Sequence, residues 1–242
     1  MKNLSNQHKG SLLAFIAVML ITPDSIFIRL SNIETWGMLF YRGAIPFVVV
    51  LIGLIFFYKN NLLKALLGMG YPGIFYVISF SICNITFLIS IQNTNVANTL
   101  VMIAMAPMLS AILGSIFLRE VPDQKTWIAI IITLISVTYI FYDSIEMGNF
   151  YGDLFGIITA FGLACNAVIA RFAKDRDLVP SAVIGKLCVA IFAFLFVDSF
   201  SLVGTDLIIV PLMCVMCVAI PFVLVTIAPR FIPAEEVNLF FL

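Results

Sequence analysis

The sequence contains few charged residues and almost no histidine. Only 11% of its 242 residues are charged, and the one histidine, His8, lies in the polar N-terminal segment. A soluble globular domain has about 25% charged residues, whereas 62% of this chain is hydrophobic. We therefore expect the protein to reside in a lipid bilayer.

Other absences exclude whole classes of function. The net charge of zero provides no basic surface for nucleic acid, and the phosphate-binding sequence G-x-x-x-x-G-K-[ST] does not occur. One histidine and scattered loop acids argue against hydrolytic or metal chemistry, so we expect no catalytic residue, cofactor or metal. The five cysteines lie in apolar runs, and we interpret even Cys214-x-x-Cys217 as buried thiols.

Long apolar runs, in contrast, are abundant. A membrane-spanning helix needs about 20 mainly apolar residues. Such runs fall at roughly 11–31, 36–58, 70–91, 96–118, 126–142, 153–172, 181–198 and 207–229, and a ninth begins near Ala234. Because backbone polar groups in lipid must be satisfied within their own segment, these runs predict helices and an all-α polytopic membrane bundle.

The basic residues of the loops predict the orientation. Alternate connections contain all ten of the following residues: Lys2, Lys9, Lys59, Lys64, Arg119, Lys125, Arg171, Lys174, Arg176 and Arg230. The connections at 31–35, 92–95, 143–152 and 199–206 contain none. Since positive residues are retained on the cytoplasmic side, we expect a cytoplasmic N-terminus in the plasma (inner) membrane.

The chain also contains an internal repeat. Residues 10–31 (GSLLAFIAVMLITPDSIFIRLS) match residues 152–173 (GDLFGIITAFGLACNAVIARFA) at an offset of 142. This register aligns Asp24 with Asn166, and a shift of two more residues aligns Arg42 with Lys186. Five spans separate the copies, so the second copy enters the membrane from the opposite side. An inverted repeat of this kind is typical of secondary transporters, whose substrate site lies between the halves.

Asp24 is the first candidate site residue. It lies deep in the first run, directly after Pro23, which removes a backbone donor. A carboxylate at this depth indicates proton coupling or contact with a substrate amine. The structural alternative is an aspartate that caps the helix restarting after the proline. Asn166, at the mirrored position, cannot titrate.

Arg42 and Lys186 are candidates for binding an anionic substrate group, Arg42 at the outer mouth and Lys186 at the inner one. Both side chains, and Arg29 too, could instead extend to the interface with their charges in water. Along the third run, Tyr76, Phe80, Cys83, Asn84 and Phe87 share one helix face. We interpret this face as cavity lining, with Tyr76 and Asn84 contacting substrate, although interhelical packing gives the same pattern.

The segments TPDSIFIRL, LFYRG, NTNVANTLVMIAMAPMLSAILGSIFLRE and VPDQKTW, in this order, resemble the EamA-like members of the drug/metabolite transporter superfamily. The resemblance covers essentially the whole chain. It implies ten spans in two inverted five-helix repeats, the first over 10–142 and the second over 152–242. By this comparison the second repeat is incomplete, since the chain stops in span nine.

The sequence thus predicts a secondary transporter or exporter of small organic metabolites, amino-acid-like or amphipathic, that works by alternating access. The alternative is a polytopic membrane enzyme acting on a lipid-type substrate, which would need clustered acids, histidines or metal ligands. A channel would need a ring of charges or a carbonyl filter. The expected partners are a small-molecule solute and the lipid bilayer, and a homodimer is compatible with the sequence.

Overall fold

A computed structural model describes residues 6–120 and 150–241, together with scattered positions between 124 and 142. The described part is helical and contains no strand. Its N-terminal helices are α1 (Asn6–Ile21), α2 (Asp24–Leu30), α3 (Thr35–Tyr58), the 3-10 helix η1 (Lys59–Asn61), α4 (Leu62–Leu67), α5 (Gly70–Asn93), α6 (Val96–Ile103) and α7 (Ala106–Phe117). After residue 149 follow α9 (Phe150–Phe172), α10 (Val179–Phe194), α11 (Asp206–Met213), the π-helical η2 (Cys214–Ala219), α12 (Ile220–Ile227), the 3-10 helix η3 (Ala228–Arg230) and α13 (Ala234–Leu239).

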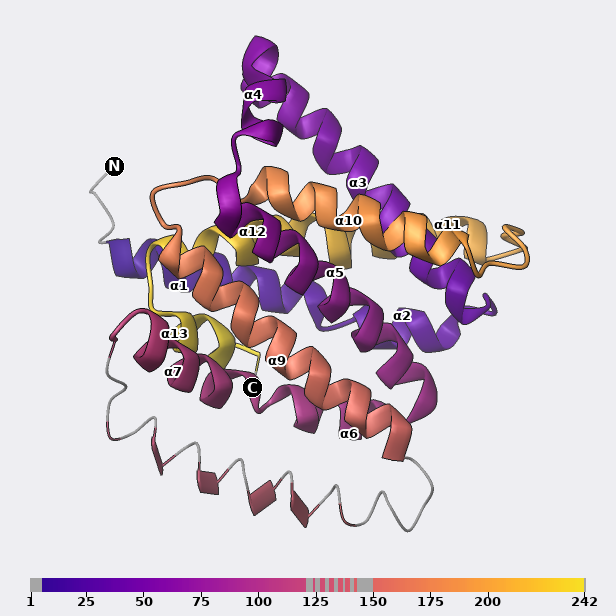
Figure 1. Ribbon diagram of the computed structural model, residues 1–242. Coiled ribbons are helices and arrows are strands. Elements are labelled where there is room, and N and C mark those ends of the chain that lie inside the picture. The colour runs from indigo at the N-terminus through magenta and orange to yellow at the C-terminus, as the bar shows by residue number, and fades with distance from the viewer. Residues whose placement is uncertain are drawn as a thin grey trace.

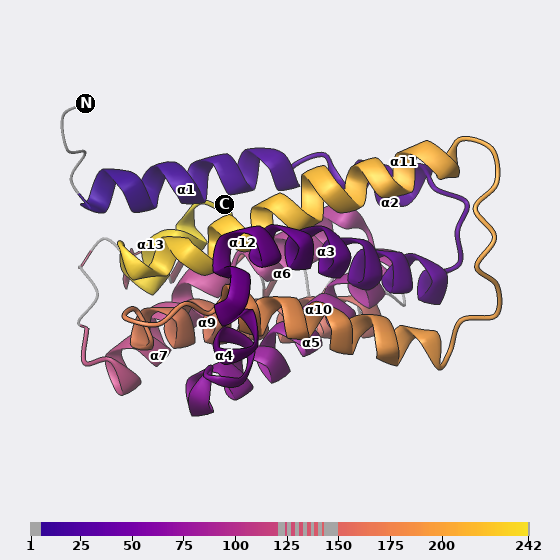
Figure 2. The same cartoon turned by 90° about the horizontal axis from the view of Figure 1, so that it is seen from above.

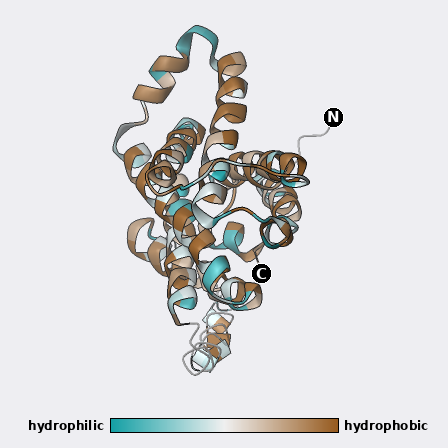
Figure 3. Cartoon of the chain, turned by 90° about the vertical axis from the view of Figure 1, so that its right-hand side faces the viewer, coloured by the Kyte–Doolittle hydropathy of each residue, from teal (hydrophilic) through white to brown (hydrophobic). Residues whose placement is uncertain are grey.

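The predicted membrane class is confirmed by length and composition. Within the described residues, six helical stretches are long and apolar enough to cross a bilayer: Asn6–Leu30, Thr35–Leu67, Gly70–Asn93, Val96–Phe117, Phe150–Phe172 and Asp206–Arg230. The predicted run 181–198 corresponds to the shorter α10, and most of the predicted run 126–142 lies outside the described residues. The helices are hydrophobic along much of their length (Figure 3), and many large apolar side chains are exposed, including Phe56 at 76% and Phe57 at 79%.

The long helices lie side by side, and their connections gather at two opposite ends of the bundle. Figures 1 and 2 show the α2–α3 and α10–α11 connections at one end. The N-terminus and the α9–α10 connection lie at the other end. This arrangement agrees with the alternation of charged and uncharged loops in the sequence.

Several spans are interrupted near prolines. The first span breaks between α1 and α2 at Pro23, and the fourth breaks between α6 and α7, just before Pro107. In the eighth span, η2 separates the helix containing Pro211 from the one containing Pro221. Proline lacks the N–H that an α-helix interior requires, so the regular hydrogen-bond ladder is disturbed at these points. The first break places Asp24 at the start of α2, inside the bundle.

Small residues allow the central helices to approach closely. At the crossing of α3 with α10, a Cβ atom on Gly43 would lie only 2.6 Å from the backbone nitrogen of Ala190. On α9, a Cβ atom on Gly156 would lie 2.9 Å from the Cβ of Met102. Both distances are below any real Cβ contact, so glycine is required there. The small residues Gly152, Gly156, Ala160 and Ala164, which share one face of α9, are all buried.

The neighbours of each helix are consistent with two inverted halves. Helix α5 of the first predicted half packs on α9, the first helix of the second half. The repeat relates α9 to α1 and α5 to α12, and α12 packs on α1 in the same way. Helices α3 and α10 correspond to each other in the repeat, and they pack directly together. Arg29 and Arg171, which the repeat aligns, make corresponding contacts. Arg29 donates to the carbonyl oxygens of Ile91 and Thr94 at the end of α5 (2.6 and 2.7 Å). Arg171 lies 3.5 Å from the carbonyl oxygen of Pro229, after α12. The repeat boundaries 10–142 and 152–242 stay a prediction.

Candidate functional site: a polar cavity in the bundle core

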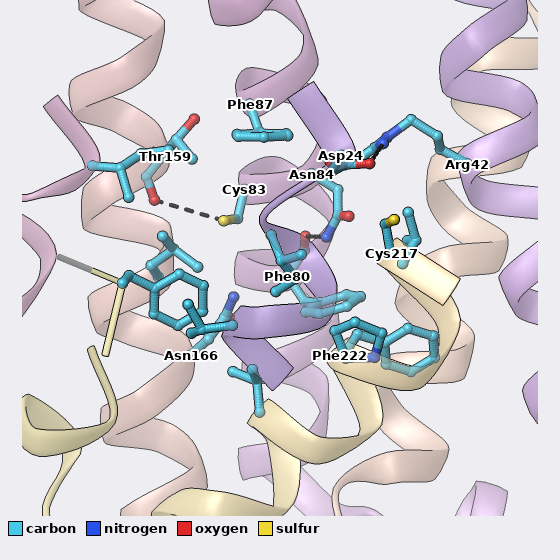
Figure 4. A pocket seen from close by; sticks show the side chains of 18 of the residues that line it. Asp24, Arg42, Phe80, Cys83, Asn84, Phe87, Thr159, Asn166, Cys217 and Phe222 are labelled. Carbon is cyan, nitrogen blue, oxygen red and sulfur yellow. Dashed lines mark hydrogen bonds and ion pairs between the residues drawn. The ribbon is translucent and has the colours of Figure 1, made fainter. Parts of the chain in front are cut away.

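A cavity of about 350 Å³ lies between the helices of both predicted halves. Its lining comes from α1, α2, α3, α5, α6, α9, α10, η2 and α12, and from the residues that follow α13. All six residues singled out from the sequence line it: Asp24, Arg42, Tyr76, Asn84, Asn166 and Lys186. Figure 4 shows several of these side chains together with Phe80 and Phe222. The structure therefore brings the six residues to one place, while their role in substrate binding stays a prediction.

Asp24 and Arg42 form a buried ion pair with two parallel hydrogen bonds. Arg42 donates from Nη1 to Oδ1 of Asp24 (2.5 Å) and from Nη2 to Oδ2 (2.9 Å). The two side chains are only 3% and 7% exposed. A paired guanidinium and carboxylate of this geometry form one of the strongest polar contacts in proteins. The pair links α2 to α3 at the level of the first helix break.

This pairing bears on two alternatives that the sequence left open. The Asp24 side chain does not cap α2, because the N-cap position is Pro23 and no side-chain cap hydrogen bond forms there. Arg42 is buried rather than extended to the interface, and both of its terminal nitrogens donate to Asp24, while its role in substrate binding stays a prediction. The sequence placed both residues in the cavity but did not reveal that they neutralise each other.

Lys186, unlike Arg42, is bonded to an amide rather than to a carboxylate. Its side chain is buried, with the residue 1% exposed, and its Nζ donates to Oδ1 of Asn84 at 2.5 Å. The Nζ also lies 5.4 Å from the ring centre of Phe80 and 5.5 Å from that of Phe222. The carboxylates of Asp24 and Glu120 form ion pairs with Arg42 and Arg171, and Lys186 has no carboxylate partner among the described residues. A buried lysine without a counter-ion is unusual and marks a functional candidate.

The Asn84 amide is oriented by its own helix. Its Nδ2 donates to the carbonyl oxygen of Phe80 at 2.8 Å, which leaves Oδ1 directed at Lys186. Within the described residues, Asp24 is the only acidic residue among those that line the cavity. The cavity therefore contains one ion pair, Asp24–Arg42, and one amine, Lys186, whose hydrogen bond goes to the amide oxygen of Asn84.

Tyr76 and Asn166 complete the set. The Tyr76 hydroxyl lies 2.9 Å from Oγ1 of Thr226, which donates to its own helix at the carbonyl oxygen of Phe222. Asn166 is 6% exposed, and its Oδ1 has no hydrogen-bond partner within the described residues. Buried polar atoms are nearly always partnered, so an unpartnered acceptor facing a cavity calls for an explanation. A ligand that donates a hydrogen bond would supply one.

The predicted stripe of α5 faces the cavity along its whole length, because Tyr76, Phe80, Cys83, Asn84 and Phe87 all line it. The sequence analysis missed Phe222 and Thr226. An offset of 142 aligns Phe80 with Phe222 and Asn84 with Thr226, but the offset of 144 that aligns Arg42 with Lys186 does not, so the repeat by itself did not single them out. Phe222 lines the cavity, and Thr226 contacts Tyr76 from behind it.

Cys214 and Cys217 are buried free thiols, as predicted. Among the described residues, no group of three or more histidine, cysteine or acidic side chains is placed to hold a metal ion. At one end of the bundle, Arg171 donates to Oε1 of Glu120 at 3.0 Å. At the other end, the hydroxyl of Tyr41 donates to the carbonyl oxygen of Phe200 at 2.6 Å.

A polytopic helical membrane protein with a solute-sized cavity among its helices has a construction found in transporters. The family model of the EamA-like transporter family matches residues 8–142. The match covers more than half of the chain, and the protein belongs to this family.

A solved structure described as "Crystal structure of protein" supports the fold. It superposes with a TM-score of 0.72 over 97% of this chain and 84% of that chain, at 14% sequence identity. At this identity the similarity shows the fold alone. The search of curated proteins finds no match.

Proposed function

We propose that the protein transports a small amphipathic solute with a carboxylate group and that Lys186 binds this carboxylate. The observation that carries the proposal is a fully buried lysine in the cavity without a carboxylate partner among the described residues. A substrate carboxylate is the natural counter-ion for such a group, because buried charges in proteins are normally paired. A charged partner also gives a stronger hydrogen bond than the amide of Asn84 alone.

The rest of the cavity supports a solute of this kind. Its volume of about 350 Å³ lies at the lower end of the range for small-molecule sites. Phe80, Phe87 and Phe222 provide aromatic walls for an apolar part. The unpartnered Oδ1 of Asn166 provides an acceptor for an amine or hydroxyl group on the same molecule. An amino-acid-like solute has all three features.

Alternating access in this bundle would use the crossing of α3 with α10, where the halves meet at Gly43 and Ala190. Contacts at the two ends, Arg171–Glu120 at one and Tyr41–Phe200 at the other, would have to loosen in turn. The Asp24–Arg42 pair would hold α2 on α3 as one unit during this movement. No finding favours the alternative of a lipid-modifying enzyme.

We further propose a plasma-membrane location with a cytoplasmic N-terminus, on the strength of the basic loops. The bundle end that contains Asn61 would then be cytoplasmic and the end that contains Ser201 external. Thiol labelling of Asn61→Cys and Ser201→Cys in intact cells checks this, because an impermeant reagent should reach position 201 alone. Labelling of position 61 alone would show that the protein has the opposite orientation.

Solute binding and uptake by the reconstituted full chain test the transport proposal. We expect phenylacetate and phenylalanine to bind and benzylamine, which has the same ring but only a positive charge, not to bind. Phenylalanine should enter proteoliposomes faster than protein-free liposomes. Lys186→Met should weaken phenylacetate binding at least about 30-fold, since truncating one side of a buried charge contact costs ~2 kcal/mol or more. Equal binding of benzylamine and phenylacetate, or an undiminished affinity in Lys186→Met, would refute the proposal.

A further inference from the structure

The charge balance of the empty cavity depends on Lys186. Asp24 is the only acidic residue among the described lining residues, and both of its oxygens accept from Arg42. Aspartate and arginine together contribute no net charge. A protonated Lys186 would therefore give the cavity lining one uncompensated positive charge, in addition to the cation of Arg42, which Asp24 neutralises.

The surroundings of the Lys186 amine replace little of the water that an ammonium group needs. Its three N–H groups have a single oxygen acceptor, Oδ1 of Asn84, and two ring faces, Phe80 and Phe222. The ring faces attract a cation, but burial out of water disfavours the charged form of a lysine more strongly than any other effect at such a site. The Asn84 contact does not require charge, because a neutral amine donates a hydrogen bond as well.

Among the described residues, no other ionisable group near Lys186 supplies a negative charge in its ordinary state. The ionisable side chains around it are Arg42 on α3, Asp24 on α2, Tyr76 and Cys83 on α5, and Cys214 and Cys217 on η2. Tyrosine and cysteine are neutral when protonated, and they lose their protons only at alkaline pH in model peptides. Asp24 is committed to Arg42.

We propose that Lys186 is the proton-carrying residue of this transporter. It is an uncharged amine in the empty cavity and takes up one proton when a carboxylate-bearing solute binds, so that solute and proton cross the membrane together. The step is balanced: the amine, one proton from water and the carboxylate give an ammonium–carboxylate pair, and release of the solute returns the proton. The inference rests on the proposed function, and it moves the coupling role that the sequence suggested for Asp24 to Lys186.

Calorimetric binding of phenylacetate to the full chain in nanodiscs tests the inference. Repeating the titration in buffers of different ionisation enthalpy gives the number of protons taken up. We expect about one proton per bound phenylacetate near neutral pH and, because the bound state then holds the extra proton, an affinity that weakens by up to about tenfold per pH unit as the pH rises.

Two variants separate the alternatives. Lys186→Arg keeps a permanent charge and leaves Asp24 in place, so it should bind phenylacetate with no proton uptake and no pH dependence over the same range. Lys174→Arg makes the same substitution at an exposed site outside the cavity and should behave as wild type. Thermal unfolding of each variant checks that it is folded.

A second measurement needs no ligand. Nitrogen NMR of protein with 15N-labelled lysine side chains, assigned with Lys186→Arg, should show Lys186 as a neutral amine at a pH at which the exposed lysines are charged. A charged Lys186 in the solute-free protein overturns the inference, as does phenylacetate binding without proton uptake or undiminished uptake in Lys186→Arg. Failure of phenylacetate to bind, together with a neutral Lys186, would instead count against the proposed function alone.

Discussion

The two predicted halves place corresponding residues around one cavity but use them differently. In the first half, Asp24 and Arg42 form a closed, two-bonded ion pair. The aligned residues of the second half are Asn166 and Lys186. Lys186 is bonded to Asn84 on α5, and the Asn166 oxygen has no partner among the described residues. The first half thus satisfies its own charges, whereas the second half leaves a donor and an acceptor for something else.

The difference indicates how a repeated scaffold can provide both rigidity and a binding site. Where the first half has Asp24, the second half has Asn166, and the aligned cation Lys186 has no carboxylate partner among the described residues. The Asp24–Arg42 pair holds α2 on α3. Lys186 and Asn166 are left available to a solute, which is the basis of the function proposed for Lys186.

The largest effect that this comparison predicts is on stability. Arg42→Met leaves the Asp24 carboxylate buried without a partner and should lower the free energy of unfolding by about 3–5 kcal/mol. Lys186→Met removes a buried amine that has no counter-ion and should change stability by less than about 1 kcal/mol. Unfolding by sodium dodecyl sulfate in mixed micelles measures both variants.

The double variant Asp24→Leu with Arg42→Met is the control for this prediction. It removes both charges at once and should recover most of the loss, because a buried ion pair can be replaced by apolar side chains at little cost. If Lys186→Met is as destabilising as Arg42→Met, Lys186 has a structural counter-ion and the contrast between the halves is wrong.

The sequence predicted the location of the polar residues well, for a physical reason. Asp24, Arg42 and Lys186 each lie inside a long apolar run, where contact with lipid would be costly. An interior cavity is the setting that removes this cost, and the structure places all three there. The helical spacing of Tyr76, Phe80, Cys83, Asn84 and Phe87 along α5 likewise predicted which face of this helix lines the cavity.

The partners of these residues were not predictable in the same way. Asp24 is 18 residues from Arg42, and Lys186 is 102 residues from Asn84. Which cation finds the carboxylate depends on how α2, α3, α5 and α10 pack, and that is set by close contacts such as Gly43 with Ala190. The sequence alone allowed Arg42 and Lys186 the same role, and only the tertiary contacts distinguish them.

The most direct test of this account restores the missing carboxylate. Asn166→Asp gives the second half the acidic residue that the first half has at Asp24, and Asn93→Asp places the same change at an exposed site outside the cavity. We expect Asn166→Asp to lower phenylacetate affinity at least about tenfold, or ~1.4 kcal/mol, because the new carboxylate competes for Lys186 and repels the solute. Asn93→Asp should bind phenylacetate as the wild type does. Unchanged or tighter phenylacetate binding by Asn166→Asp, measured calorimetrically on folded protein, would contradict the assignment of Lys186 and Asn166 as the open half of the site.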